Sequence, residues 1–300
     1  MKDLLGIRQM SANAIHDVLD VASEMKKSWL SGKRRDDLSG KQVTTVFYEN
    51  STRTKTSFTL AAEAVGARVN SLDVSSSSVQ KGESLIDTGK TLDALGSDIV
   101  VIRHRASGAP LFLSKNIKAA VVNAGDGANE HPTQALLDFF TMREEFGWIS
   151  GLKVAIIGDI KHSRVARSDL WGLKTLGAEV AFCGPKTLLP EGFERECRVT
   201  TDPKEAVKDA DVVMALRIQL ERQKQGLFPS LREYNAGWGV TDELLSYASP
   251  HAIVMHPGPV NRGVEISGAV ADGGRSRINT QVTNGVAVRM AVLTLVGRGE

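Results

Sequence analysis

The sequence alternates between two hydrophobic patterns, helical spacing and short apolar runs. Apolar residues recur every three or four positions after Ser11, which predicts a helix that begins with a serine N-cap. Short apolar runs in the first half of the chain predict buried strands at 41–47, 67–72, 98–103 and 119–125. Amphipathic stretches between and after these runs predict helices at 53–65, 83–96 and 132–146.

The same alternation begins again near residue 150. In the second half, strands are predicted at 153–158, 179–184, 211–216 and 252–256. Helices are predicted at 163–177, at the start of 202–216 and at 284–296. Strands that alternate with helices of this length are typical of parallel sheets covered by helices on both faces. The sequence therefore predicts an α/β protein with two doubly wound parallel-sheet domains of similar size.

Composition and charge exclude several classes of protein. The chain has 300 residues and a net charge of +2, so nothing in its bulk charge favours nucleic acid or an acidic membrane. It starts without an apolar signal segment, and its longest apolar stretch, 285–297, is interrupted by Arg289. Cys183 and Cys197 have no neighbours at metal-ligand spacing. We expect a cytoplasmic protein with reduced cysteines, no zinc site at these cysteines and no membrane contact.

Hydroxyl and basic side chains are concentrated after the first predicted strand. The segment YENSTRTKTSF (48–58) carries five hydroxyls and two cations between Asn50 and Ser57. A helix N-terminus offers backbone N–H groups and a positive dipole end, and arginine adds a planar fork for phosphate oxygens. A serine or threonine N-cap explains only one or two of these residues. The segment predicts a phosphate site, but the glycines of a nucleotide-binding P-loop are absent.

Further polar residues follow other predicted strands of the first half. Arg103 ends the strand at 98–103, and His131 and Gln134 open the helix that follows the strand at 119–125. In open α/β sheets, ligands bind beyond the carboxyl ends of the strands. Arg103 can add a second cation for a dianion, His131 can donate to an oxyanion and Gln134 can pair with an amide. Arg103 alone is equally compatible with an ordinary cation at a strand end, and a lone histidine at a helix start, such as His131, is usually a cap or surface residue.

The second half carries residues suited to carboxylates at the equivalent places. Arg164 follows the strand at 153–158, and Arg217 and Gln219 follow the strand at 211–216. Guanidinium groups bind carboxylates through two parallel hydrogen bonds. The segment HPGPVNRG follows the strand at 252–256, and its prolines stiffen backbone that can present carbonyls to a ligand. Together these residues predict a phosphate-bearing ligand on the first domain and a carboxylate-bearing ligand on the second.

Segments along essentially the whole chain resemble the aspartate carbamoyltransferase family. They are YENSTRTKTSF, SSSSVQKGESLIDT, VIRH, EHPTQALLDFFT, RIQLER and HPGPVNRGVEI, in this order. STRT together with HPTQ is specific for carbamoyltransferases, and the later segments indicate the aspartate member. The resemblance implies that the carbamoyl group of carbamoyl phosphate is transferred to the amine of L-aspartate in pyrimidine synthesis, without a metal or cofactor.

The resemblance also implies roles for individual residues. The carbamoyl phosphate-binding positions are matched by Ser51, Thr52, Arg53, Thr54, Ser77, Lys81, Arg103, His131, Gln134, Pro257 and Gly258. The aspartate-binding positions are matched by Lys81, Arg164, Arg217 and Gln219. The catalytic positions are matched by Arg53, Thr54, Lys81, Arg103, His131 and Gln134. Thr54, Arg103 and His131 would polarise the carbonyl, and Gln134 would bind the carbamoyl NH2 group.

The family further implies how the chain is divided. A carbamoyl phosphate-binding domain is expected at 1–131, an interdomain helix at 132–149 and an aspartate-binding domain at 150–283. The closing helix at 284–300 is expected to pack back on the first domain.

A homotrimer with shared active sites is also implied, in which Ser77 and Lys81 reach the neighbouring subunit's site. Glu49 is expected to link the domains through Arg164 and Arg222. Association with regulatory chains in a dodecamer, or with dihydroorotase, stays open. Gln80 replaces a second lysine found in some relatives, and HPGP replaces the HPLP of others, which affects the expected backbone contacts at 257–259.

Other functions are less compatible with the sequence. Ornithine carbamoyltransferases share STRT and HPTQ but carry HCLP and SMG segments, where this chain has HPGP (256–259) and RIQ (217–219). Transfer to ornithine or another acceptor remains the alternative within the superfamily. A non-catalytic assembly partner would have lost phosphate or carbamoyl ligands, which are all present. A dinucleotide-binding dehydrogenase needs three glycines, whereas VAIIGDIKHSR (154–164) has one.

Overall fold

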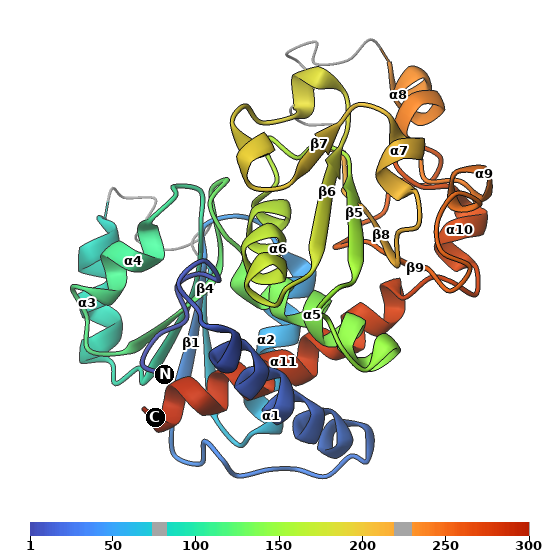
Figure 1. Ribbon diagram of the computed structural model, residues 1–300. Coiled ribbons are helices and arrows are strands. Elements are labelled where there is room, and N and C mark those ends of the chain that lie inside the picture. Colours follow the sequence, from blue (N-terminus) through green and yellow to red (C-terminus); the bar gives the residue numbers. More distant parts are fainter. Residues whose placement is uncertain (74–82, 219–229, 300) are drawn as a thin grey trace. The chain divides into compact units, whose positions relative to one another are not determined.

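The computed structural model describes residues 1–73, 83–218 and 230–299 and divides into two compact units (Figure 1). Unit 1 contains Met1–Phe140 and Thr283–Glu300, and unit 2 contains Thr141–Val282. The chain passes from one unit to the other within α5 (Pro132–Phe146) and within α11 (Ile278–Arg298).

Unit 1 is built on a four-stranded parallel sheet with the order β2-β1-β3-β4. The strands are β1 (Gln42–Phe47), β2 (Arg68–Asp73), β3 (Ile99–His104) and β4 (Ala120–Asp126). The helices, besides its parts of α5 and α11, are α1 (Ala12–Leu30), α2 (Thr52–Ala64), α3 (Leu85–Ala94) and α4 (Ala109–Ser114) (Figure 1).

Helices cover both faces of this sheet. Neighbouring residues of a strand point to opposite sides, so each strand packs against helices on both faces. On one face, Val100 and Ile102 of β3 pack in a buried cluster with Leu92 of α3 and Leu113 of α4. Ile99 points to the other face, where α11 approaches so closely that a Cβ added at Gly297 would lie 3.2 Å from the Ile99 side chain. The strands are therefore buried on both sides, which agrees with their continuous apolar runs.

Unit 2 is built on a five-stranded parallel sheet with the order β7-β6-β5-β8-β9. The strands are β5 (Lys153–Ile157), β6 (Glu179–Cys183), β7 (Arg198–Thr200), β8 (Val212–Ala215) and β9 (Ile253–Met255). The helices are α6 (Arg164–Thr175), α7 (Pro203–Val207), α8 (Leu231–Trp238), α9 (Asp242–Leu245) and α10 (Gly268–Asp272), with 3₁₀ turns η3 (Lys186–Leu188) and η4 (Phe193–Arg195) (Figure 1).

This second sheet is also covered on both faces. Cys183 of β6 belongs to a buried cluster with Val207 of α7 and Leu244 of α9. The preceding residue, Phe182, points the other way and its ring centre lies 6.0 Å from that of Phe193 in η4. The prediction of two parallel-sheet α/β domains is confirmed.

The predicted elements agree with the structure apart from their ends and several short pieces. Ser11 caps α1, because its Oγ accepts a hydrogen bond from the Ala14 N–H at 3.2 Å. The closing helix begins at Ile278, earlier than predicted, and β9 ends at Met255. The sequence analysis did not predict the short elements α4, η3, η4, β7, α8, α9 and α10, because three to eight residues give too little periodicity.

A buried carboxylate joins the C-terminal helix to the segment that precedes β1. Asp37 Oδ2 accepts from Arg35 Nε at 2.6 Å, and Asp37 Oδ1 accepts from Arg35 at 3.0 Å and from Arg298 of α11 at 2.9 Å. The hydrogen bonds from Arg35 hold the pKa of the Asp37 carboxyl below its ordinary value of 3.8. A carboxyl whose pKa is lowered by folding stabilises the fold above that ordinary value, and the contribution is lost as the pH falls through the lowered pKa.

We therefore expect Asp37→Asn to lower the free energy of unfolding at pH 7 by about 1 kcal/mol, a typical value for charge-assisted hydrogen bonds after solvent screening is discounted. The difference from wild type should shrink as the pH falls below 3.8. Urea unfolding at pH 7 and between about pH 4 and pH 2 measures this. The exposed neighbour Asp36 provides the control Asp36→Asn, and an equal loss in both variants would contradict the assignment.

Candidate active site

The carboxyl ends of three neighbouring strands gather the predicted phosphate ligands in unit 1. Strands β1, β3 and β4 lie side by side and parallel, so their ends share one edge of the sheet. Phe47 is in register with Arg103, and His104 is in register with Asp126. The Tyr48 N–H donates to the Arg103 carbonyl at 2.9 Å, which holds the start of the 48–51 segment against β3. The structure therefore places the residues after β1, β3 and β4 at one edge.

Ser51 differs from the other serine N-caps of the chain. Among the described residues, five serines cap a helix through a side-chain hydrogen bond, namely Ser11, Ser84, Ser163, Ser230 and Ser267. Ser51 is the N-cap of α2, yet within the described part of the chain its hydroxyl makes no capping bond. The first N–H groups of a helix have no intrahelical partner. The start of α2 thus keeps the donors that a phosphate requires, which counts against a purely structural cap.

The three residues after Ser51 differ in exposure. Thr52 and Arg53 are exposed, whereas Thr54 is buried. A helix N-terminus with hydroxyls and an exposed guanidinium is an anion-binding arrangement. The four residues of the predicted STRT motif therefore occupy the N-cap and first turn of α2.

A carboxylate holds Arg103 at the end of β3. Its Nε donates to Glu49 Oε2 at 3.2 Å, and both side chains are largely buried. Glu49 was predicted to link the two domains through Arg164 and Arg222. The structure shows Glu49 bonded to Arg103 within unit 1, and Arg222 lies outside the described residues.

His131 is fixed by the loop that precedes α5. Asp126 exchanges hydrogen bonds with Glu130, whose N–H donates to Asp126 Oδ1 and whose carbonyl accepts from the Asp126 N–H, both at 3.1 Å. The Glu130 carboxylate accepts from the N–H groups of Ile7 and Arg8 at 2.8 and 3.2 Å. His131 itself is only 5% exposed and lies directly before Pro132, the first residue of α5. Its backbone position is therefore fixed on both sides.

Asp138 orients the amide of Gln134. Gln134 Nε2 donates to both carboxylate oxygens of Asp138, at 3.0 and 3.2 Å, and Asp138 is fully buried. A carboxylate only accepts hydrogen bonds, so the nitrogen end of the amide faces Asp138 and the oxygen end points away from it. Gln134 can therefore offer an acceptor to a ligand NH2 group.

A buried arginine of α11 interacts electrostatically with Asp138. Arg289 of α11 donates to the Gly285 carbonyl at 2.9 Å and lies 5.1 Å above the Phe58 ring. Burial lowers the pKa of Arg289 to about 10, and Asp138 opposes that shift. The guanidinium hence stays charged near neutral pH.

The predicted carboxylate ligands of unit 2 also follow neighbouring parallel strands. Strands β5, β8 and β9 lie side by side. Arg164 is the first residue of α6 after β5, and Arg217 comes shortly after β8. Pro257 and Gly258 follow β9, and Gly258 has a φ of 66°, in the left-handed region that favours glycine. The glycine of HPGP thus suits the backbone of this turn.

Three predicted site residues, Ser77, Lys81 and Gln219, lie outside the described residues. Among residues that the structure does describe, sequence reasoning missed Glu130 and Asp138. The spacing of four residues between Gln134 and Asp138 on one helix was an available signal. No comparable signal connects Glu130 with Ile7, because that contact joins distant parts of the chain.

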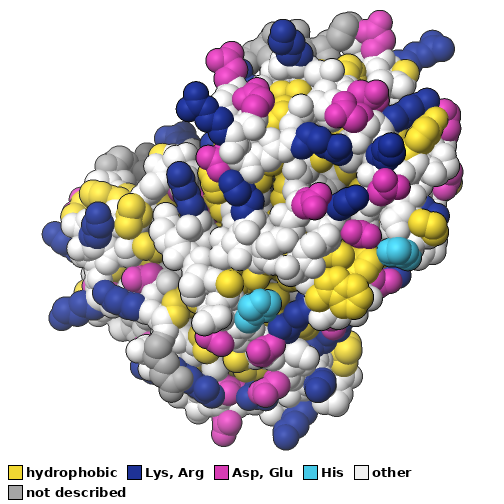
Figure 2. All heavy atoms as spheres, viewed as in Figure 1, with side chains coloured by type: hydrophobic (Ala, Val, Ile, Leu, Met, Phe, Trp, Pro, Cys, Tyr) yellow, Lys and Arg dark blue, Asp and Glu magenta, His cyan; other side chains and the backbone are white. Residues whose placement is uncertain are grey.

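Other chemistries find little support in the described part of the chain. Within it, no cluster of three or more histidine, cysteine, aspartate or glutamate side chains could hold a metal ion, and no helix is long and apolar enough to cross a membrane. Cys183 and Cys197 are free, and burial raises the pKa of both thiols to about 12, so neither is an activated nucleophile. Figure 2 shows basic and acidic side chains interspersed over the face in view, without a large patch of one sign.

Two family models together match most of the chain. The model described as "Aspartate/ornithine carbamoyltransferase, carbamoyl-P binding domain" matches residues 2–144. The model described as "Aspartate/ornithine carbamoyltransferase, Asp/Orn binding domain" matches residues 150–296.

Curated relatives cover the full length at high identity. The aspartate carbamoyltransferase catalytic subunit of Ruminiclostridium cellulolyticum is 59% identical over 299 residues, which are 99% of this chain and 96% of that protein. The catalytic subunit of Acetivibrio thermocellus is 57% identical over 100% of this chain and 96% of its own length.

Solved structures of two enzymes superpose on the chain about equally well. Aspartate transcarbamoylase of Trypanosoma cruzi, in complex with carbamoyl phosphate and aspartate, has a TM-score of 0.89 at 32% identity and covers 98% of this chain and 96% of its own. Ornithine carbamoyltransferase of Pyrococcus furiosus also has a TM-score of 0.89, at 29% identity over 100% of this chain and 98% of its own. The matched domains and the full-length relatives agree, and the chain belongs to the aspartate carbamoyltransferase catalytic subunits.

Proposed function

We propose that this chain transfers the carbamoyl group of carbamoyl phosphate to the amine of L-aspartate, which gives N-carbamoyl-L-aspartate and phosphate. The observation that carries the proposal is the start of α2, where an N-cap serine leaves its hydroxyl out of the helix cap at the sheet edge that also holds Arg103. The family and its full-length relatives supply the reaction to which this anion site belongs.

Carbamoyl phosphate is assigned to the donors of unit 1. Ser51, Thr52, Arg53 and Thr54 would hold the phosphate at the helix N-terminus. Thr54, Arg103 and His131 would donate to the carbonyl oxygen, whose negative charge grows as the amine attacks. Donors fixed before the reaction stabilise such charge without reorganisation. The burial of His131 and the anchored backbone on either side of it support this role.

Gln134 is assigned to the NH2 group of carbamoyl phosphate. Its carbonyl oxygen would accept from that group, because Asp138 already takes the amide nitrogen. The backbone carbonyls of Pro257 and Gly258 are assigned to the same NH2 group. These contacts would fix the plane of the carbamoyl group before attack, which is the main requirement of a reaction whose leaving group is already good.

Aspartate is assigned to the cations of unit 2. Arg164 would bind the α-carboxylate, and Arg217 with Gln219 would bind the β-carboxylate through paired hydrogen bonds. The amine then attacks the carbonyl carbon, the new C–N bond forms, and the C–O bond to phosphate breaks. The departing phosphate accepts the proton of the amine. Lys81 is assigned to both substrates from the family resemblance.

The acceptor is assigned by sequence rather than by fold. The chain superposes on an aspartate enzyme and on an ornithine enzyme with the same TM-score of 0.89. The relatives at 57–59% identity are aspartate enzymes, and Arg217 is suited to a second carboxylate rather than to a cation. Ornithine is therefore the second candidate acceptor, to be tested beside aspartate.

The proposals for oligomeric state, cellular location and pathway rest on the family alone. We propose a homotrimer in which Ser77 and Lys81 complete the site of a neighbouring subunit. We further propose a cytoplasmic enzyme of pyrimidine synthesis. Regulatory chains or dihydroorotase are candidate partners of this trimer.

The reaction is tested by product formation from carbamoyl phosphate with either L-aspartate or L-ornithine, in buffer that contains EDTA. We expect carbamoyl aspartate and no citrulline, at a rate that EDTA does not change. Citrulline alone would contradict the role of Arg217. Absence of both products from a folded assembly would favour a non-catalytic partner role.

The orientation of Gln134 is tested by Asp138→Asn. An asparagine can accept or donate, so the Gln134 amide is free to rotate and present its NH2 group to the carbamoyl NH2 group. We expect kcat/KM to fall roughly tenfold, the scale of one lost hydrogen bond with an unpaired donor in its place. Steady-state kinetics with carbamoyl phosphate varied measures the effect.

The exposed carboxylate of Glu144, on the same helix, provides the control Glu144→Gln. Thermal unfolding of both variants separates loss of stability from loss of alignment. Because Asp138 also interacts electrostatically with the buried Arg289, some loss of Tm is expected in Asp138→Asn. Activity within about twofold of wild type in Asp138→Asn would contradict the orienting role.

The shared site is tested by mixing two inactive variants, Arg53→Ala and Lys81→Ala. If each site takes Lys81 from a neighbour, mixed trimers contain some sites with neither change and recover part of the wild-type activity. Dissociation and reassembly, followed by separation of the mixed species, provides the sample. Mixed trimers that stay inactive would count against a site shared between subunits.

A further inference from the structure

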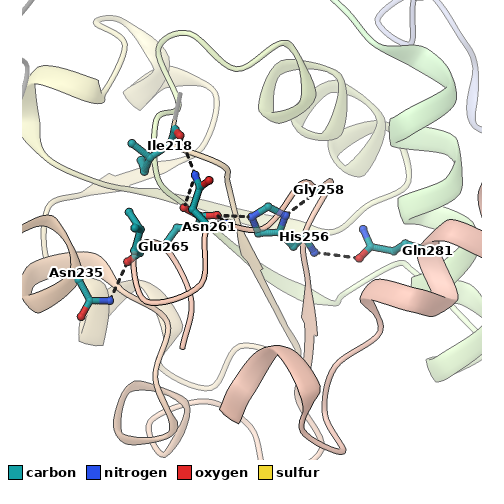
Figure 3. A network of polar contacts seen from close by, with 8 residues as sticks. Ile218, Asn235, His256, Gly258, Asn261, Glu265 and Gln281 are labelled. Carbon is teal, nitrogen blue, oxygen red and sulfur yellow. Dashed lines mark hydrogen bonds and ion pairs between the residues drawn. The ribbon is translucent and has the colours of Figure 1, made fainter. Parts of the chain in front are cut away.

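A buried polar network in unit 2 surrounds the turn after β9 (Figure 3). Its centre is the carboxylate of Glu265, whose side chain is 1% exposed, beside the ring of His256, which is 0% exposed. His256 Nε2 lies 3.1 Å from Glu265 Oε1, and the Asn261 N–H donates to the same oxygen at 2.6 Å. Asn261 Nδ2 donates to Glu265 Oε2 at 3.2 Å.

The contacts of His256 determine where its proton lies. The Gly258 N–H donates to His256 Nδ1 at 2.7 Å, and a backbone N–H is only a donor. Nδ1 must therefore be unprotonated, and Nε2 carries the proton that it donates to Glu265. Glu265 thereby fixes the tautomer and the ring orientation of His256, and the ring in turn holds the Gly258 N–H.

The same carboxylate also controls a second segment. Asn261 Nδ2 donates to the Ile218 carbonyl at 3.0 Å as well as to Glu265. Ile218 directly follows Arg217, so this bond holds the backbone next to the proposed aspartate ligand. Figure 3 shows Asn261 between Ile218 on one side and His256 on the other.

A residue of α11 holds the start of the turn, directly after β9. The His256 N–H donates to Gln281 Oε1 at 3.0 Å, which fixes the start of the turn. Burying a carboxylate costs free energy, and apolar residues of similar volume would stabilise this core at least as well. Stability alone therefore does not explain Glu265. The donors on Glu265 instead serve to fix the directions of two backbone segments.

We propose that Glu265, acting through His256 and Asn261, is a positioning residue that aligns the Pro257–Gly258 carbonyls and the Arg217 segment as one frame. The inference rests on the proposed function, in which the first segment receives the carbamoyl NH2 group and the second receives aspartate. The frame has two arms, the contact of His256 with the turn and the contact of Asn261 with the Arg217 segment. Substitutions can remove each contact separately. Loss of the first should lower kcat, and loss of the second should raise the KM for aspartate.

The arm to the turn is tested with His256→Asn and His256→Gln. Asparagine places an acceptor near the position of Nδ1 and can keep the Gly258 contact, whereas glutamine reaches towards Glu265 and loses that contact. We expect His256→Gln to lower kcat roughly tenfold and His256→Asn to stay within about threefold of wild type. Equal losses of kcat in both variants, in proportion to their loss of Tm, would overturn this arm.

The arm to Arg217 is tested with Asn261→Ala. Its matched control is Asn235→Ala, because Asn235 Nδ2 donates to the Val264 carbonyl at 2.8 Å in the same network without contacting either segment. We expect the KM for aspartate to rise about fivefold in Asn261→Ala, with the KM for carbamoyl phosphate within about twofold of wild type. Asn235→Ala should change neither constant by more than about twofold, and the same kinetic change in both variants would overturn this arm.

Hydrogen exchange of the backbone amides at 256–262 tests the frame independently of enzyme activity. Pro257 and Pro259 lack amides, so Gly258 and Asn261 contribute half of the four amides between Pro257 and Gly263. Exchange should be faster in His256→Gln than in His256→Asn, and equal exchange would overturn the frame. Wild-type protein that forms no carbamoyl aspartate would instead reject the proposed function, while this exchange measurement still decides whether the frame exists.

Discussion

Parallel strand pairing is the constraint on which the rest of this structure depends. Parallel neighbours end at the same edge, so residues far apart in sequence meet wherever the sheet order makes their strands adjacent. In unit 1 the order β2-β1-β3-β4 brings together the ends of β1, β3 and β4. In unit 2 the order β7-β6-β5-β8-β9 does the same for β5, β8 and β9. The candidate site residues of each unit follow three adjacent strands for this reason.

Buried carboxylates then determine how the side chains and turns at these edges are oriented. Asp138 takes the nitrogen end of the Gln134 amide, and Glu265 takes the protonated nitrogen of His256. Glu49 similarly takes Nε of Arg103 at the end of β3. Each carboxylate converts a side chain that could point in two ways into one with a single orientation. The sheets thus bring the ligands together, and the buried acids determine which atoms they present.

The fold and the positions of most candidate ligands could be predicted from the sequence because both depend on local patterns. Apolar runs located β1, β3 and β4, and the hydroxyl-rich segment after β1 lies at the start of α2 as expected. The orienting carboxylates could not be found in this way. Glu130 bonds to Ile7, which lies 123 positions earlier in the sequence, and Glu49 bonds to Arg103, 54 positions later. Contacts between residues far apart in sequence leave no periodic pattern of hydrophobic residues. In short elements such as β7 this pattern is too weak to detect.

The two superpositions separate what the fold determines from what individual side chains determine. An aspartate enzyme and an ornithine enzyme match the chain with the same TM-score of 0.89, so backbone geometry does not distinguish their acceptors. In the proposed reaction, acceptor choice would therefore depend on side chains rather than on the backbone. Arg217 is the proposed ligand of the second carboxylate. The Ile218 backbone beside it is connected through Asn261, Glu265 and His256 to the turn at Gly258. If Glu265 aligns both the Pro257–Gly258 turn and the Arg217 segment, as proposed, a change of acceptor would need a compatible turn as well as a new side chain at position 217.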